Sequence, residues 1–199
     1  MSRLIETIRL LDGVFYNLSY HTLRMRWAWK EIFSIDQPWD LGEVLTNHAV
    51  PKAGLFKCRV TYDTKLLGIT FDPYVAKKVS SLRLIHDDLV SYDHKFENRI
   101  ALENLFVKRG KCDDVLIVKE GLITDTSYAN ILFKRGDEWV TPESCLLPGT
   151  MRQQMIDNGK VRVERIWADQ VGSFEKFRLI NSMLLDEAPE VKVSSIILE

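Results

Sequence analysis

The order of predicted strands, helices and turns in the second half of the chain constrains its fold more than any other feature. Apolar residues alternate with polar ones in the first of these segments, recur at helical spacing in the second and form a short continuous run in the third. The predicted elements are a strand at 80–86, a helix at 98–110, a strand at 114–118, and hairpin turns at Glu120-Gly121 and Gly136-Asp137. A strand followed by a helix and another strand predicts an α+β or mixed α/β lobe.

Residues 1–90 predict a second, smaller α/β lobe. Residues 4–11 combine β-branched and apolar side chains and run into Asp12-Gly13, a pair typical of a tight hairpin turn. The rest of this lobe is expected to contain a helix capped by Asn17 or Ser19 and reaching Phe33, a short helix within 38–50, and a hairpin of 55–62 with 66–71. We therefore expect two domains, a small lobe at 1–90 and a larger lobe at 91–199.

The composition narrows the class of protein. Of the 199 residues 46% are hydrophobic, so the chain can bury a substantial core. Its 27 Lys and Arg nearly balance its 28 Asp and Glu, and the formal charge of −1 offers no basic excess for nucleic acid. Charges interrupt every apolar stretch that could serve as a signal peptide or a membrane span. Because the three cysteines are scattered, we expect free thiols and a soluble, cytoplasmic protein.

Two motifs stand close together in the middle of the chain. The first is Lys95-Phe96-Glu97-Asn98-Arg99, and the second runs from Glu120 to Phe133 and contains Glu-Gly-Leu-Ile-Thr-Asp, then Asn-Ile-Leu-Phe. Together they resemble the class IV aminotransferase family, which comprises the pyridoxal-phosphate enzymes of fold type IV. This resemblance implies a two-lobed architecture like that of D-amino-acid aminotransferase, pyridoxal 5'-phosphate as cofactor, and a cofactor site in the larger lobe.

The resemblance also implies a role for particular residues. Lys95 would be the catalytic lysine, which forms a Schiff base with the cofactor and, once released, acts as a base. Asp125 stands where relatives usually have glutamate and would keep the pyridine nitrogen protonated. Arg24, in a His-x-x-Arg segment, and the amides at a predicted helix start would hold the phosphate. The residues implied to bind the cofactor are Arg24, Lys95, Asp125, Asn130, Gly149, Thr150, Met151, Asn181 and Ser182.

Taken one at a time, these residues also fit simpler explanations. Lysine among Glu, Asn and Arg is ordinary surface composition, Arg24 suits the outer face of an amphipathic helix, and Asp125 suits a turn. Arg59, on a strand where the lyase branch of the family has a second basic residue near the substrate, fits an edge charge equally well. No metal site is expected, because there is no i, i+4 pairing and no cysteine partner for His21, His48, His86 and His94.

The residues leave three functional hypotheses open. The opening Glu6-Thr7-Ile8-Arg9, followed by Asp12-Gly13, resembles the aminodeoxychorismate lyase branch, which removes a ring proton and releases pyruvate to give p-aminobenzoate for folate biosynthesis. A branched-chain or D-amino-acid transaminase would use the same residues. A degenerate family member that binds the cofactor without turnover is suggested by Asp125 and by an N-terminal lobe that is trimmed relative to relatives. The family implies a small-molecule amino substrate and a homodimer.

Overall fold

The computed structural model describes residues 2–198, and the chain divides into two compact units. Unit 1 contains residues 1–76 and 94–98, and unit 2 contains residues 77–93 and 99–199. The boundary therefore differs from the predicted one at residue 90, because the strand at 82–86 pairs with a strand of unit 2. Residues 94–98 belong to unit 1 because their backbone bonds to its first strand.

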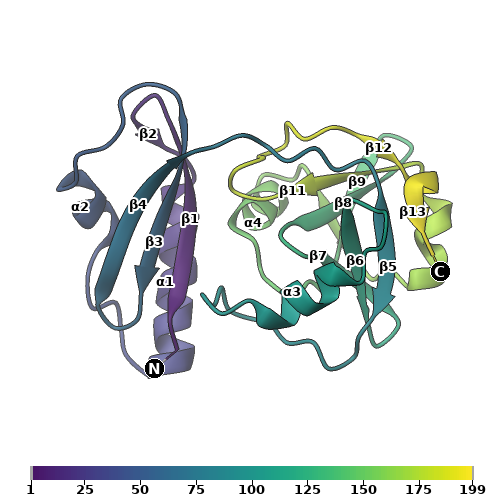
Figure 1. The fold of residues 1–199 in the computed structure, drawn as a ribbon, viewed down its shortest axis with the longest axis horizontal. Coiled ribbons are helices and arrows are strands. Elements are labelled where there is room, and N and C mark those ends of the chain that lie inside the picture. Colours follow the sequence, from purple (N-terminus) through teal and green to yellow (C-terminus); the bar gives the residue numbers. More distant parts are fainter. Residues whose placement is uncertain (1, 199) are drawn as a thin grey trace. The chain divides into compact units, whose positions relative to one another are not determined.

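Unit 1 is an antiparallel sheet covered on one face by a helix (Figure 1). Its strands follow the order β2-β1-β3-β4. The elements are β1 (Leu4–Leu11), β2 (Val14–Phe15), α1 (Leu18–Phe33), α2 (Leu41–Thr46), β3 (Leu55–Tyr62) and β4 (Leu66–Pro73). Side chains of α1 and of the sheet form one buried cluster, which includes Leu4, Ile8, Met25, Trp29, Cys58, Val60 and Tyr62.

Most local predictions for unit 1 are confirmed, with shifts at the helix ends. The hairpin turn forms as predicted, with positive φ angles of 49° at Asp12 and 81° at Gly13. Asn17 does precede α1, but it is in the left-handed conformation and its side chain makes no capping bond. The second helix covers less of 38–50 than predicted, because the Asp40 side chain caps its start by accepting from the Glu43 amide.

Unit 2 contains two sheets. Their strand orders are β10-β9-β8-β11-β12 and β13-β5-β6-β7. The strands are β5 (Leu82–His86), β6 (Asp114–Lys119), β7 (Leu122–Thr126), β8 (Asn130–Arg135), β9 (Glu138–Pro142), β10 (Arg162–Glu164), β11 (Lys176–Ile180), β12 (Val191–Lys192) and β13 (Ile196–Ile197). The helices are α3 (Ile100–Val107), α4 (Thr150–Asp157) and the 3-10 turns η1 (Ala168–Ser173) and η2 (Val193–Ser195). β5 and β6 are parallel, whereas β6–β7 and β8–β9 are antiparallel hairpins.

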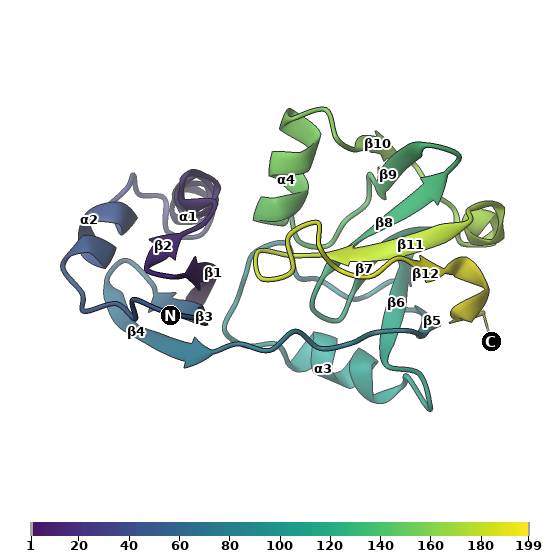
Figure 2. The ribbon, with the colours of Figure 1, turned by 90° about the horizontal axis from the view of Figure 1, so that it is seen from above.

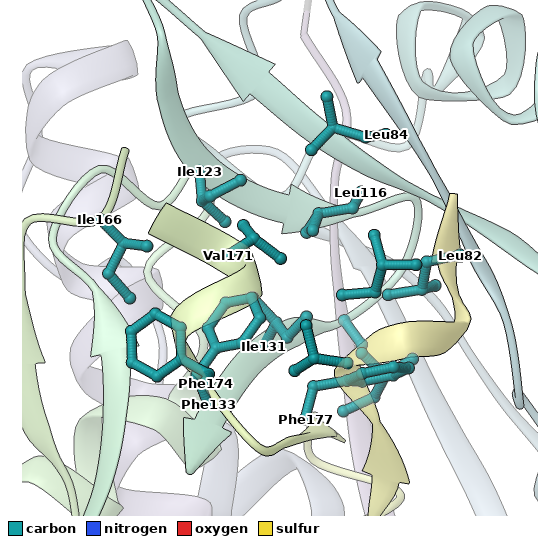
Figure 3. Packing of buried hydrophobic residues seen from close by; sticks show 14 of the residues in the cluster. Leu82, Leu84, Leu116, Ile123, Ile131, Phe133, Ile166, Val171, Phe174 and Phe177 are labelled. Atoms are coloured by element: carbon teal, nitrogen blue, oxygen red, sulfur yellow. The ribbon is translucent and has the colours of Figure 1, made fainter. Parts of the chain in front are cut away.

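The core of unit 2 lies between its two sheets (Figure 3). Leu116 of β6 and Ile123 of β7 face Phe133 of β8 and Phe177 of β11, and none of these four side chains is exposed. Phe174 packs against Phe133 with ring centroids 5.0 Å apart. Burial of this much apolar surface is the main force that holds the two sheets together.

The helices of unit 2 lie on different sheets (Figure 2). α3 contacts β6, whereas Met151 and Met155 of α4 pack against Leu132 of β8 and Ile180 of β11. α3 is shorter at both ends than the predicted 98–110. The short strands β10, β12 and β13 were not predicted, since two or three residues show no periodicity. Within residues 2–198, no helix is long and apolar enough to cross a membrane.

Candidate active site

The segment that carries Lys95 is bound to the first strand of unit 1. The amide of Ile5 donates to the carbonyl oxygen of Lys95 at 2.9 Å, and the amide of Glu97 donates to the carbonyl of Arg3 at 2.9 Å. Phe96 forms an isolated antiparallel bridge with Leu4 between these two bonds. The half-buried Lys95 is thus held beside β1 by its own backbone.

A buried ionic cluster follows one residue further along β1. The Glu6 carboxylate is fully buried and accepts two hydrogen bonds from Arg24, from Nε at 2.9 Å and from Nη2 at 2.5 Å. The same carboxylate lies 2.6 Å from Nδ1 of His21, which is also fully buried. His21 and Arg24 are three residues apart on α1, so both project from the same side of the helix toward β1. The predicted phosphate ligand Arg24 is therefore fixed by Glu6.

Burial and the neighbouring charges in this cluster shift the pKa values of both Glu6 and His21. Burial alone would raise the pKa of Glu6, but the charge of Arg24 and the hydrogen bond from His21 outweigh it and lower the pKa to about 2. Burial lowers the pKa of His21, and the charges of Arg24 and Lys95 lower it further against the opposing effect of Glu6. The neutral imidazole then donates from Nδ1 to Glu6. Among residues 2–198, no group pairs with the buried Nε2 of His21.

His94 lies against the same helix. Its ring stacks on that of Trp27, with centroids 4.1 Å apart and planes inclined by 31°, and it is buried. The stack fixes the residue immediately before Lys95. Nη2 of Arg59, on β3, lies 3.3 Å from Oε1 of Glu97. This ion pair helps to hold the segment that carries Lys95. The expected substrate role of Arg59 stays a prediction.

In unit 2, Asp125 is held by hydrogen bonds on both carboxylate oxygens. Nδ2 of Asn130 donates to Oδ1 at 2.8 Å, and the amide of Leu147 donates to Oδ2 at 2.9 Å. Burial raises the pKa of Asp125 to about 6, although these two bonds and the charge of Arg152 act in the opposite direction. A buried carboxylate with this pKa is suited to meet a cationic ring nitrogen, whose charge would favour the ionised form.

Asn130 connects Asp125 to the turn before α4. Its Nδ2 also donates to the carbonyl of Leu147 at 2.9 Å. On the other side, a methyl group on Gly149 would overlap the side-chain oxygen of Asn130, so glycine is needed for the close approach. Gly149 is extended, and α4 begins at Thr150, which is buried. The first amides of this helix have no partner within the helix and are the groups that the sequence predicts to bind an anion; this role stays a prediction.

Asn181 and Ser182 follow β11 in the same unit. Oδ1 of Asn181 accepts from the amides of Met183 at 2.9 Å and Leu184 at 2.9 Å, which shapes the turn after the strand. Ser182 lies half-buried in this turn. The structure thus brings Asp125, Asn130 and Gly149 together and places Asn181 and Ser182 at a strand end, while their contacts with a cofactor remain predictions.

Sequence reasoning missed several residues that support the site. Arg152 is buried, donates to the carbonyl of Pro142 at 2.8 Å and lies close enough to Asp125 to affect its charge. Arg99 donates to the carbonyl of Ser127 at 2.6 Å, within the loop between β7 and β8. Arg99 ends the motif that begins at Lys95, and Arg152 lies on the helix that begins after Gly149, so each had a signal in the sequence. Glu6 had only its place in the opening strand.

Comparison with known proteins places this chain in a family. The model of the family described as amino-transferase class IV matches residues 3–186. The chain belongs to this family. A crystal structure of a "putative 4-amino-4-deoxychorismate lyase" from Haemophilus somnus 129pt is 30% identical, with a TM-score of 0.86 over 92% of this chain and 97% of that one. A "putative aminodeoxychorismate lyase" from Schizosaccharomyces pombe is 26% identical over 91% of this chain and 86% of its own length.

A third relative concerns the cofactor of the class IV family. The pyridoxal-phosphate-bound form of a hypothetical aminotransferase from Mycobacterium tuberculosis has a TM-score of 0.75, covering 96% of this chain and 80% of that one. Its identity of 15% establishes a shared fold alone. The family match confirms the predicted pyridoxal-phosphate cofactor at the level of the family, and this relative confirms the fold type IV architecture.

The described residues fit that cofactor. Gly149 lets the side chain of Asn130, which orients Asp125, lie against the start of α4. In unit 2 the amides that begin α4 suit a phosphate and the buried Asp125 carboxylate suits a ring nitrogen. In unit 1 the guanidinium of Arg24 suits a phosphate and the amine of Lys95 suits an aldehyde. Asp125 in place of glutamate does not break this match, because both of its oxygens are already oriented by hydrogen bonds.

Proposed function

We propose that this chain is a pyridoxal-phosphate-dependent 4-amino-4-deoxychorismate lyase, which releases pyruvate and leaves p-aminobenzoate for folate biosynthesis. The observation that supports the lyase most is the likeness to the Haemophilus somnus protein over nearly the whole of both chains, at 30% identity. The Schizosaccharomyces pombe relative carries a similar name at lower identity. The opening strand, in which Glu6 is followed by Thr7, Ile8 and Arg9, supports the same branch.

In this proposal Lys95 has two tasks. Its Nζ holds the cofactor until the substrate amine replaces it, and the released amine then takes the proton from the substrate ring carbon. The backbone bond from Ile5 and the stacked neighbour His94 keep Lys95 in place. An amine can act as a base at neutral pH only if burial or a nearby cation lowers its pKa.

The other residues hold the cofactor and substrate in place. When bound, pyridoxal phosphate supplies an electron sink conjugated to the substrate amine. The Asp125 carboxylate would keep a proton on the pyridine nitrogen, while Arg24, the amides of Thr150 and Met151, and Ser182 would bind the phosphate. Loss of the ring proton and cleavage of the bond to the enolpyruvyl oxygen then yield an aromatic ring and pyruvate, and the proton passes to the departing enolpyruvyl group.

A transaminase for branched-chain or D-amino acids is the alternative proposal, since it would use the same residues, and a degenerate protein that binds the cofactor without turnover is a further one. We also propose a cytoplasmic homodimer that acts on a small amino substrate. Light scattering of the purified protein tests the dimer, and the mass of a single chain would contradict it.

The deciding experiment offers the reconstituted protein 4-amino-4-deoxychorismate and follows both products. We expect p-aminobenzoate by fluorescence and equal amounts of pyruvate by coupled oxidation of NADH with lactate dehydrogenase. A panel of amino acids with 2-oxoglutarate should give no keto acid above background. Keto-acid formation without pyruvate from the chorismate derivative would establish the transaminase instead, and neither product would establish the degenerate protein.

A further inference from the structure

We propose that Glu6 is a positioning residue for the cofactor phosphate, acting through Arg24. This inference rests on the proposed function, because the phosphate role of Arg24 is part of that proposal. The observation that carries it is the pair of hydrogen bonds from Nε and Nη2 of Arg24 to the two carboxylate oxygens of Glu6. A bidentate pair of this kind fixes the plane of the guanidinium as well as its position.

The burial of the pair makes the positioning rigid. Glu6 is fully buried and the Arg24 side chain is only 8% exposed. Glu6 lies on β1, whose neighbour β3 is paired with it over its full length, so the carboxylate is carried by the most regular part of unit 1. Arg24 lies on α1, which packs on the same sheet. Both partners are therefore attached to rigid elements, and the edge of Arg24 bonded to Glu6 is unavailable to a ligand.

His21 completes the arrangement from the other side of Glu6. Its Nδ1 lies 2.6 Å from the carboxylate oxygen that also accepts from Nη2 of Arg24. With donors from two side chains, the buried carboxylate keeps its charge without water. The net charge of Glu6, Arg24 and a neutral His21 is zero, so the cluster can stay buried before any anion binds. The site is thus assembled in advance and does not depend on the phosphate for its order.

The test compares the affinities of the apo-protein for pyridoxal 5'-phosphate and for pyridoxal, which lacks the phosphate, by absorbance titration. Their ratio isolates the phosphate contribution and does not need turnover. We expect Glu6→Gln to lower the affinity for pyridoxal 5'-phosphate by roughly tenfold or more, because Arg24 loses a charged hydrogen-bond partner, and to change the affinity for pyridoxal by less than about twofold. Glu43→Gln, the same change at an exposed site in α2, should leave both affinities unchanged.

Two further variants separate the possible outcomes. Glu6→Asp keeps the charge but withdraws the carboxylate, so it should also reduce the ratio, and it carries the test if Glu6→Gln does not fold. Arg24→Lys cannot bridge both oxygens, and in its background Glu6→Gln should have no further effect on the ratio. A ratio that falls in Arg24→Lys but not in the Glu6 variants overturns the positioning role alone. An unchanged ratio in Arg24→Lys removes the phosphate role of Arg24, and a Glu6 effect that persists there shows that Glu6 does not act through Arg24.

Discussion

Nδ2 of Asn130 lies 2.8 Å from Oδ1 of Asp125 and 2.9 Å from the carbonyl oxygen of Leu147, so a single amide group connects the buried carboxylate to the turn before α4. Asn130 thereby orients the group proposed to face the ring nitrogen and shapes the site proposed to hold the phosphate. Changes in this small network are expected to affect both ends of the cofactor, and they give the sharpest tests in unit 2.

Asn130→Ala should weaken cofactor binding and shift its pH dependence. Asp125 has to be ionised to meet a protonated ring nitrogen, and loss of the Asn130 donor raises the pKa of Asp125 further above its present value of about 6. The midpoint below which the apo-protein loses affinity for pyridoxal 5'-phosphate should therefore move to higher pH. Absorbance titrations between pH 5 and pH 8 measure this midpoint. Asn158→Ala, at the exposed end of α4, is the control, and an identical midpoint in both variants would contradict the prediction.

The raised pKa of Asp125 should also make the free energy of unfolding of the apo-protein depend on pH. Because its pKa is raised in the folded state, the folded protein binds more protons than the unfolded chain between about pH 4 and pH 6, so the free energy of unfolding falls as pH rises through this window. A rise of about two in pKa corresponds to about 3 kcal/mol. Asp125→Asn should remove this decline, whereas Asp137→Asn at an exposed turn should retain it. Urea unfolding at pH 4 and pH 6.5 gives the comparison, and parallel declines in all three proteins would refute it.

Glu6 should make the free energy of unfolding change with pH in the opposite direction, at lower pH than Asp125 does. Its pKa is lowered to about 2 in the folded state, so its contribution is present above about pH 4.5 and is lost as the pH falls toward 2. The free energy of unfolding of the apo-protein should thus rise by up to about 3 kcal/mol across this range before the effect of Asp125 sets in. Glu6→Gln should flatten the rise. An equally steep rise in that variant would mean that other carboxylates cause it.

Gly149→Ala should damage the site without unfolding the protein. The added methyl group would overlap the side-chain oxygen of Asn130 and force the amide away from Asp125. We expect a loss of about 1 to 3 kcal/mol in the free energy of unfolding, as for other overpacked sites, together with a marked loss of affinity for pyridoxal 5'-phosphate. Gly172→Ala is a matched control in the same unit, because a methyl group there meets no atom within 4 Å. Equal behaviour of the two variants would show that the contact with Asn130 is unimportant.

Lys95→Ala tests the proposed catalytic residue directly. Treatment of the reconstituted protein with borohydride should bleach the cofactor band and attach the cofactor to a peptide that contains Lys95. Lys95→Ala should give no such adduct and no detectable turnover, since both the covalent link and the base are lost. Lys30→Ala, at an exposed position of α1, should retain both. An adduct spread over surface lysines in the unchanged protein would exclude a dedicated lysine.

The parts of the fold that the sequence predicts well are those determined locally. The turns at Asp12-Gly13 and Glu120-Gly121 were predictable because each ends in a glycine, the residue that adopts positive φ most readily. The strand of residues 4–11 was predictable from its composition, and its bounds are confirmed. Lys95, Asp125 and Gly149 were found as candidates because each lies in a short motif that can be recognised without knowledge of the fold.

The parts that could not be predicted depend on contacts between distant residues. Glu6 and Arg24 are separated by 18 positions, and no local pattern indicates that a strand carboxylate and a helix guanidinium will form a buried pair. The boundary at residue 76 differs from the predicted division at residue 90, because the strand at 82–86 pairs with residues 114–118 and its own sequence does not reveal that partner. The left-handed conformation of Asn17 likewise depends on how α1 meets the preceding hairpin.

The return of residues 94–98 to unit 1 affects how this protein is made. The amide of Ile5 can donate to the carbonyl of Lys95, and the carbonyl of Arg3 can accept from the amide of Glu97, only after residues 94–98 have been synthesised. When residue 76 has been added to the growing chain, unit 1 therefore still lacks one of its segments. Neither unit corresponds to one uninterrupted stretch of the gene. An exchange of one unit between related genes would need three crossover points, so the two units are expected to be inherited together.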